Sequence, residues 1–407
     1  MSEETSMSDS VWILGTSMTR FGRHEGLDVV DLASEAALGA LDDGGVTVYD
    51  LDALACGTLF AANAGVGQQL LGQIGQTGIS VYNVANACAT GATALRVAVM
   101  AIRSGEASMA MALGVEKMGK MGLLGSTPKG AGRAKVFEPS GRFGSVRSVD
   151  GILGTKTMPG VFGQAGMRYA HDHPGVGFEQ FAKIAHKNHL HSVLNPLAQY
   201  RKPFSLAEIK ASPMVAYPNT LLMCCPTGDG AAAAVLVSGE RLSTLSTDQR
   251  RRAVKLSASV LTSDPYVEGG QVQPDVNTLT RNAADAAYEQ AGVDPGDLDL
   301  VELHDCFASA ELIHYDNLRL CEPGGAGDFI DSGAPCRDGA VPVNVSGGLI
   351  SKGHPIGATG VANVYEIATH LRGEAGDRQI PDARVGLAHV IGLGSSCAVH
   401  ILERSAA

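Results

Sequence analysis

The feature that most restricts how this chain can fold is a diverged internal duplication. A stretch with helical periodicity at residues 27–41 leads into TVYDLDALACGTLF, and a similar stretch at 276–291 leads into VDPGDLDLVELHDCF, so that Asp52 corresponds to Asp299. Further along, ATALRVAVMAIRSGEA is echoed by GVANVYEIATHLRGEA. Two copies of one supersecondary pattern therefore predict two similar halves rather than a single continuous core.

Each half alternates short apolar runs with helical stretches. This alternation is typical of α/β proteins and predicts a mainly parallel sheet with crossover helices. The runs MAMALGVE and VGLAHVIGLG predict buried strands, and the halves close with the apolar strands AAAAVLVSG and CAVHILER. Two such halves packed together give an α/β fold of five layers, α/β/α/β/α.

One long stretch, residues 119–221, interrupts the first half between its last strands. Its early part is rich in glycine and basic residues, and an insertion of this length is uncommon unless it is functional. From Lys117 to Lys210 the chain carries 14 basic and five acidic residues, although its net charge is −11. This excess suggests an anionic ligand such as nucleic acid or a phosphate-bearing cofactor, with a solvated basic face as the alternative.

The insertion sets the expected domain boundaries. The first half comprises 1–118 and 222–248, the inserted loop domain 119–221, and the second half 249–407.

Composition and the N-terminal residues exclude several classes of protein. No run approaches the roughly 18 uninterrupted apolar residues that span a bilayer. The polar start MSEETSMSDS has no basic or apolar segment of a signal peptide, which predicts a cytoplasmic protein. The cysteines show no CxxC spacing, which argues against a zinc site and against a disulfide framework. They are Cys56, Cys88, Cys224, Cys225, Cys306, Cys321, Cys336 and Cys397.

Two segments carry the chemistry. In NVANACATGATAL, Cys88 lies where an apolar run gives way to small residues and then to a helical pattern, so the positive end of the helix dipole is expected to favour its thiolate. In NVSGGLISKGHPIGATG, His354 lies in a glycine-lined turn before a helix. Equivalent positions in the two halves predict that thiol and imidazole meet, as acyl transfer requires.

Three motifs in this order resemble the separated signatures of the thiolase family. They are NACATG around Cys88, HDCF at 304–307 and GHPIGATG from Gly353, and the likeness extends from about residue 11 to 402. HDCF, in place of an asparagine-containing motif, is similar to the sterol-carrier-protein type. The resemblance implies a duplicated five-layered fold, an inserted loop domain that covers coenzyme A, and a homodimer or dimer of dimers.

The resemblance also implies roles for particular residues. Cys88 is the expected nucleophile, and His304 and His354 are expected to form one oxyanion hole. The backbone N–H groups of Cys88 and Gly392 are expected to form a second one, with Gly392 in a loop that approaches the substrate. Phe162 aligns with a family loop that packs on the pantetheine arm of coenzyme A, although an aromatic residue here also suits a simple core position.

A second cysteine is expected to carry protons. The family's usual C-terminal CxG cysteine is replaced here by Val390, which cannot do so. We therefore expect Cys306, in HDCF, to act as the general acid and base, because an ordinary thiol exchanges protons near neutral pH. Cys397, in an apolar strand, is expected to be inert, and the alternative for Cys306 is a small packing residue.

Five histidines in the insertion raise the question of a metal site. They are not accompanied by acidic or cysteine ligands, so a polar, solvated helix face is the preferred interpretation and no metal is expected. These residues are His171, His173, His186, His189 and His191.

The expected activity is cleavage of a 3-ketoacyl-CoA by coenzyme A, giving a shortened acyl-CoA plus acetyl-CoA or propionyl-CoA, without metal or redox cofactor. Coenzyme A is a substrate, and neither nucleic acid nor membrane is an expected partner. Three alternatives remain open. A decarboxylating ketoacyl synthase needs no acid/base Cys306, a sterol side-chain aldolase lacks the nucleophile Cys88, and a non-catalytic acyl-CoA or lipid carrier has no need of either.

Overall fold

The computed structural model describes residues 10–119, 158–265, 276–393 and 395–405, together with the backbone of 140–141 and 144–145. Its strands form a nine-stranded sheet in the order β11-β12-β13-β10-β1-β9-β4-β2-β3. The first half contributes β1 (Val11–Met18), α1 (Val29–Gly44), β2 (Ala53–Gly57), α2 (Val66–Ile74), β3 (Ser80–Val84), α3 (Thr90–Arg103), β4 (Met109–Lys117) and β9 (Asp229–Ser238). The second half contributes β10 (Val254–Thr262), α9 (Val276–Ala291), β11 (Leu300–Glu302), α10 (Ala308–Asn317), α11 (Ala326–Asp331), α12 (Gly348–Ser351), α13 (Thr359–Leu371), β12 (Val385–Gly392) and β13 (Ser396–Arg404).

The sheet order confirms the duplication. The order β2-β4-β9-β1 in the first half is repeated as β11-β12-β13-β10 in the second, with the same sequence of parallel and antiparallel pairings. The two aligned aspartates, Asp52 and Asp299, also make equivalent hydrogen bonds. Asp52 accepts hydrogen bonds from the backbone of Ser108 and Met109 (2.8 and 3.0 Å), and Asp299 from Arg384 and Val385 (2.7 and 2.9 Å). Each carboxylate thus fixes the start of an equivalent strand.

The expectation of a mainly parallel sheet is wrong. Among the described strands of this sheet, β2–β3, β2–β4 and β11–β12 pair parallel and the other pairs are antiparallel. The reason is that the last strand of each half, β9 or β13, runs antiparallel to the strand before it, β4 or β12. Because β12 and β13 are joined by a short turn, they can only pair antiparallel. In the first half the equivalent connection, from β4 to β9, contains the inserted residues.

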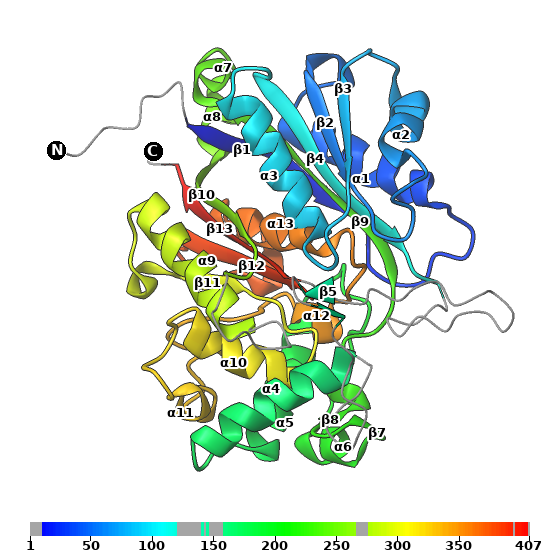
Figure 1. The fold of residues 1–407 in the computed structure, drawn as a ribbon. Helices are drawn as coiled ribbons and strands as arrows, with labels where there is room; N and C mark the ends of the chain where they lie inside the picture. The colour runs from blue at the N-terminus through cyan, green and yellow to red at the C-terminus, as the bar shows by residue number, and fades with distance from the viewer. Residues whose placement is uncertain are drawn as a thin grey trace, which may run out of the picture.

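Five layers arise because the sheet has α3 and α13 packed between its two halves (Figure 1). Alternate residues of β4 face different layers, as a strand's period of two requires. Met109, Met111 and Leu113 pack toward α1 and α2, whereas Ala110 and Ala112 pack toward the central helices. The small alanines allow the helices to approach closely, and α9 and α10 cover the opposite outer face.

Local signals explain individual elements. Helix α1 begins where Asp28 accepts hydrogen bonds from the backbone of Val30 (2.7 Å) and Asp31 (2.9 Å), and it ends at Gly45, whose φ of 62° is left-handed. None of the helices in the described ranges is long and apolar enough to cross a bilayer.

The described part of the insertion packs on the second half, below the sheet in Figure 1. The predicted boundaries at 118, 221 and 248 remain predictions. The insertion contains β5 (Ser140–Gly141), β6 (Gly144–Ser145), α4 (Met158–Asp172), α5 (Phe178–Ser192), α6 (Leu206–Ala211), β7 (Met214–Ala216) and β8 (Asn219–Thr220), and after β9 follow α7 (Gly239–Ser243) and α8 (Thr247–Arg252).

Candidate active site

Cys88 occupies a tight turn between β3 and α3. Ala87, directly before it, has a φ of 47°, which is unusual for a residue with a side chain, and Ala89 is the N-cap of α3. Strain of this kind is characteristic of functional sites. The Cys88 side chain is buried among Leu59, Met118 and Ile356. The turn therefore places the thiol among apolar side chains at the start of a helix.

Two imidazoles from the second half reach this thiol. His354 lies in the turn between α12 and α13, and His304 lies between β11 and α10. Their rings are 5.1 Å apart between centroids at an angle of 79°, and one nitrogen of each lies with the Cys88 sulfur in a group whose members are all within 4.8 Å of one another. The fold thus brings together three residues predicted to act together.

The tautomer of His354 follows from its neighbour Thr359. The Thr359 hydroxyl donates to the carbonyl of Pro355 at 3.0 Å, so its 2.7 Å contact with His354 must be donated by the Nδ1–H of the imidazole. A neutral imidazole then has an unprotonated Nε2. This atom is buried and has no hydrogen-bond partner in the described part of the chain, so it is free to accept the Cys88 proton.

Burial favours the neutral forms of Cys88, His304 and His354. Burial and, in smaller part, the nearby Glu116 raise the pKa of Cys88 to about 12, whereas burial lowers the pKa of His354 to about 3. The pKa of His304 lies well below its usual range for the same reason. Burial thus opposes the thiolate that the position at the helix N-terminus is expected to favour.

Gly392 lies against the Cys88 turn, as the last residue of β12 rather than in the expected loop, and its approach to the substrate remains a prediction. A Cβ at Gly392 would lie 2.9 Å from the Asn86 carbonyl oxygen and 3.1 Å from the Ala89 nitrogen. No side chain fits there. Glycine at this position therefore lets the end of β12 come against the backbone on both sides of Cys88.

Cys306 and Phe162 border the same site. Cys306 is buried, and burial is the main reason why the pKa of its thiol lies well above the ordinary value. The neighbouring thiols of Cys225 and Cys88 raise this pKa further. Cys306 is therefore a protonated thiol at neutral pH. Phe162 lies in helix α4, not in a loop, with its ring centroid 6.5 Å from that of His304 and 5.7 Å from that of Phe307.

A buried carboxylate that the sequence did not reveal joins three segments at the site. Glu116, at the end of β4, accepts hydrogen bonds from the Thr58 hydroxyl (3.0 Å) and from the backbone of Leu59 (2.8 Å), Phe60 (3.1 Å) and Gly357. Gly357 belongs to the GHPIGATG turn. The only signal in the sequence was one glutamate at the end of an apolar run.

A second buried network ties HDCF to the insertion. Asp305 accepts hydrogen bonds from the backbone of Leu349 (2.7 Å) and Ile350 (3.2 Å) in α12 and from the Asn188 amide (2.8 Å) in α5. Asn188 also donates to Glu311 at 2.6 Å, and Glu311 forms a buried ion pair with Lys187 at 2.8 Å. Since Asp305 lies between His304 and Cys306, α5 helps to fix both.

We expect Asn188→Ala to lower kcat by roughly 10- to 100-fold, because small misplacements of reacting groups have effects of this size. It also leaves two buried carboxylates short of a donor, which should reduce the free energy of unfolding by about 1–3 kcal/mol. Steady-state kinetics and urea unfolding measure both effects. Conversion of exposed Gln69 in α2 to alanine is the control, and an unchanged kcat for Asn188→Ala would refute the positioning role.

The helix α5 histidines differ from the prediction of a solvated face. His189 and His191 are buried, whereas His171 is exposed and His173 and His186 are partly buried. His189 contacts the Ser351 hydroxyl and the Leu222 carbonyl (3.1 and 3.0 Å), and His191 contacts the Asn344 carbonyl (3.0 Å). Because α5 packs against the segment before His354, these rings support the turn that carries His354. Within the described ranges, the group found to suit a metal ion by spacing is Cys88, His304 and His354.

Buried histidines make stability depend on acid. Burial lowers several histidine pKa values below the unfolded value near 6.5, so the unfolded chain binds protons that the folded chain excludes. The contribution of these histidines to the free energy of unfolding is complete above pH 6.5. It is lost as the pH drops toward 3, by up to about 1.4 kcal/mol per pH unit for each histidine. We expect a lower urea midpoint at pH 5 than at pH 7.5, with a weaker pH dependence in His400→Gln; equal midpoints would contradict this. The pKa is about 3 for His191, His314, His354 and His400, and about 4 for His370.

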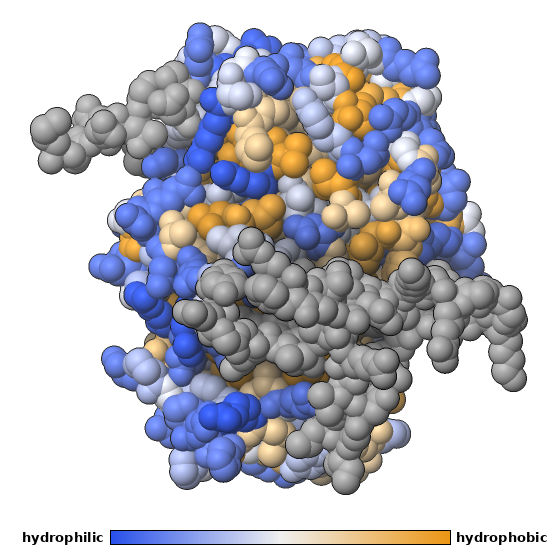
Figure 2. All heavy atoms as spheres, in the orientation of Figure 1, coloured by the Kyte–Doolittle hydropathy of each residue, from blue (hydrophilic) through white to orange (hydrophobic). Residues whose placement is uncertain are grey.

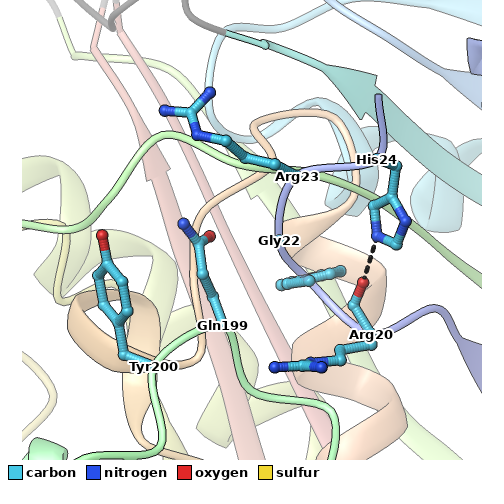
Figure 3. A pocket seen from close by; sticks show the side chains of 7 residues that line it. Arg20, Gly22, Arg23, His24, Gln199 and Tyr200 are labelled. Atoms are coloured by element: carbon cyan, nitrogen blue, oxygen red, sulfur yellow. Dashed lines mark hydrogen bonds between the residues drawn. The ribbon is translucent and has the colours of Figure 1, made fainter. Parts of the chain in front are cut away.

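One open pocket of about 350 Å³ borders the turn that carries His354 (Figure 3). A Cβ on Gly353 would meet the side chains of Gln199 and Phe21, at 3.0 and 3.3 Å. Arg20 and Arg23 also line the pocket, and Arg23 donates to the backbone carbonyl of Gly119, where the insertion begins. Positive charge thus lies beside the site from the first half as well as in the insertion.

The basic excess of the insertion is partly neutralised within the fold. Lys183 pairs with Asp331, Lys187 with Glu311, and Lys210 with Glu179, each at 2.8 Å. Arg168 pairs with Asp172 at 2.7 Å. Seven of the 14 basic residues, among them Lys129 and Arg133, lie outside the described residues. Internal pairing therefore accounts for much of the charge in the described part.

Comparisons with known proteins show the family to which the chain belongs. Family models described as "Thiolase, N-terminal domain" and "Thiolase, C-terminal domain-like" match residues 11–215 and 271–404. Sterol carrier protein 2 of Homo sapiens is 38% identical over 97% of this chain and 72% of that protein, and an acetyl-CoA acetyltransferase of Methanothermobacter thermautotrophicus is 35% identical over 97% and 99%. Among solved structures, an Ltp2-ChsH2(DUF35) aldolase has the same fold, with a TM-score of 0.77 at 23% identity over 98% of both chains. The chain therefore belongs to the thiolase family.

Proposed function

We propose that the protein is a coenzyme A-dependent thiolase that cleaves 3-ketoacyl-CoA into a shortened acyl-CoA and acetyl-CoA or propionyl-CoA. The observation that carries this proposal is the buried group of one thiol and two imidazoles within 4.8 Å. A thiol next to an imidazole with a free Nε2 is the arrangement that acyl transfer needs. A relative at 35% identity over nearly the full length is an acetyl-CoA acetyltransferase.

The first half-reaction begins with transfer of the Cys88 proton to Nε2 of His354. The thiolate then attacks the 3-keto carbon, the bond between C2 and C3 breaks, and its electron pair forms the enolate of the departing acyl-CoA. The enolate oxygen accepts hydrogen bonds from His304 and protonated His354. Cys306 donates its proton to C2, and the acyl group remains on Cys88 as a thioester.

The second half-reaction transfers this acyl group to coenzyme A. The Cys306 thiolate takes the proton of the coenzyme A thiol, whose sulfur attacks the acyl carbon. The oxygen of the tetrahedral intermediate accepts hydrogen bonds from the backbone N–H groups of Cys88 and Gly392. Cys88 then leaves and regains its proton from His354. The burial that raises the pKa of Cys306 makes its thiolate a stronger base for this step.

The direct test is the loss of 3-ketoacyl-CoA absorbance after coenzyme A is added, with acetoacetyl-CoA and with long-chain, 2-methyl-branched and steroid-side-chain esters compared by kcat/KM. Since a relative is named sterol carrier protein 2, a non-catalytic lipid carrier is the second candidate. A carrier would bind acyl-CoA esters without consuming any of them, and this result would refute the proposed activity.

We further infer that coenzyme A phosphates bind to positive charge on the insertion and beside Arg20 and Arg23. Phosphate contacts weaken as salt screens them. The KM for coenzyme A is therefore expected to rise several-fold as salt increases from about 0.05 to 0.5 M, corresponding to Debye lengths from roughly 14 to 4 Å, while kcat changes less. Dephospho-coenzyme A should be a poorer substrate. Indifference to salt and to the 3′-phosphate would leave the charge as a solvated face.

Self-association is also part of the proposal. Strand β3 lies at the edge of the sheet with Tyr82 exposed, and Met100 of the adjacent α3 is 55% exposed. Figure 2 shows apolar atoms gathered over α3 and the strands beside it. A free edge with apolar neighbours favours pairing with another chain. Sedimentation equilibrium should give a dimer or tetramer mass that Tyr82→Lys lowers, whereas a wild-type monomer would contradict this inference.

A further inference from the structure

We propose that Cys88, His304 and His354 also form a reversible binding site for one Zn²⁺ ion, and that this ion silences the enzyme by occupying the nucleophile. The three donor atoms come from three separate segments and lie within 4.8 Å of one another. One thiolate and two imidazoles are ligands that zinc prefers, and a three-ligand set leaves a fourth position for water. The proposed thiolysis uses no metal, so zinc acts here as an inhibitor.

An unpartnered buried nitrogen supports this site independently of the spacing. Nε2 of His354 has no hydrogen-bond partner among the described residues, and this side chain is fully buried. Buried polar atoms without a partner are uncommon in folded proteins. His354 also donates its other ring nitrogen to Thr359, as zinc-bound histidines usually do to a neighbouring acceptor.

The geometry requires only a small contraction. Zinc binds sulfur at about 2.3 Å and imidazole nitrogen at about 2.0–2.1 Å, which places ligand atoms of a tetrahedral site roughly 3.5 Å apart. A group already within 4.8 Å reaches this spacing by side-chain movements of about 1 Å or less. Both imidazoles lie at the ends of elements fixed by Glu116 and Asp305, so the donors are held near one another before any ion arrives.

The changes in charge and in bound protons are also consistent with zinc binding at Cys88. Binding replaces the Cys88 proton by Zn²⁺ and releases that proton to solvent, so affinity should rise with pH. The ion keeps one net positive charge after it binds the thiolate. Glu116 interacts electrostatically with Cys88 and provides a carboxylate close enough to compensate this charge.

Bound zinc and a bound acyl group exclude each other, because both require the Cys88 sulfur. Free zinc would therefore inhibit in competition with acylation of the enzyme. The binding itself depends on the three donors and not on the proposed activity, so the two proposals can fail separately.

The test is a titration of the full chain with Co²⁺, a spectroscopic substitute for zinc. We expect one Co²⁺ per chain with a thiolate-to-cobalt charge-transfer band that Zn²⁺ abolishes by displacement. Cys88→Ser should remove the band, and the matched control Cys397→Ser, also at a buried thiol, should keep it. Thr359→Val should weaken binding roughly 10- to 100-fold, as loss of a histidine's partner does, whereas Thr359→Ser should bind normally.

A measurement on the unmodified protein avoids any effect of substitution on folding. Zn²⁺ should protect Cys88 from alkylation by iodoacetamide, read by peptide mass spectrometry, without slowing alkylation of Cys321. No stoichiometric band, a band that survives in Cys88→Ser, or alkylation of Cys88 at an unchanged rate would each overturn the zinc site. Zinc binding in a chain that fails the thiolysis assay would refute the proposed function only.

Discussion

Cys88→Ala is expected to abolish thiolysis, with kcat/KM reduced by at least about 10⁴-fold, the scale seen when a covalent nucleophile is removed. No other described thiol lies with His304 and His354 inside the group of donors. Steady-state assays with acetoacetyl-CoA and coenzyme A measure this loss. Binding of coenzyme A should remain, because the substitution removes one buried sulfur and leaves the insertion unchanged.

The control is Cys56→Ala, which removes a different fully buried thiol from β2, on the side of the sheet that faces α1 and α2. It should retain activity while losing some stability. If Cys88→Ala still cleaves 3-ketoacyl-CoA at a rate near that of the unmodified protein, covalent catalysis at this residue is refuted.

Cys306→Ala is expected to lower thiolysis by roughly 100-fold or more, within the usual range for a general acid or base. The substitution removes the proton donor to the enolate and the base for coenzyme A. Acylation of Cys88 by acetyl-CoA should be impaired less, since it still uses His354 and the backbone oxyanion hole, and a coenzyme A thiolate, unlike an enolate, can leave without a proton donor. Comparing turnover with single-turnover acylation separates the two effects.

The matched variant is Cys397→Ala, in β13, where the thiol is fully buried and its pKa is raised to about 12 by burial. We expect this variant to keep its activity. Normal turnover of Cys306→Ala together with a loss in Cys397→Ala would show that the proton carrier had been assigned to the wrong cysteine.

Much of the fold could be predicted because the same short sequence pattern occurs in both halves of the chain. The correspondence of Asp52 with Asp299 was visible as an alignment, and the structure gives both carboxylates the same task at the start of β4 and β12. The direction of the strands could not be read in this way. Alternation of strands and helices does not specify that β9 and β13 return antiparallel, because that depends on which neighbours they pair with.

The members of the candidate site were visible in motifs, but their protonation was not. Position at a helix N-terminus suggested a thiolate at Cys88, whereas Leu59, Met118 and Ile356, from distant segments, bury it and raise its pKa. Burial is a property of the whole fold. The same reason explains the histidines of α5, whose polar appearance in the sequence hid their packing against the segment before His354.

Supporting residues were the hardest to find. Glu116 and Asn188 belong to no motif, and each acts through hydrogen bonds to residues far away in the sequence. A single charged or amide residue in an apolar or helical run carries little information alone. Only the assembled structure shows that one holds the GHPIGATG turn and the other the HDCF segment.

The most direct test of the central claim is to look for the covalent intermediate. The unmodified protein should be incubated with acetoacetyl-CoA without added coenzyme A, quenched in acid, digested and analysed by mass spectrometry. Acyl transfer at Cys88 predicts an acetyl thioester on the peptide that contains Cys88, which disappears when coenzyme A is added. An unmodified Cys88 peptide during turnover, or an acetyl group on another cysteine, would contradict it.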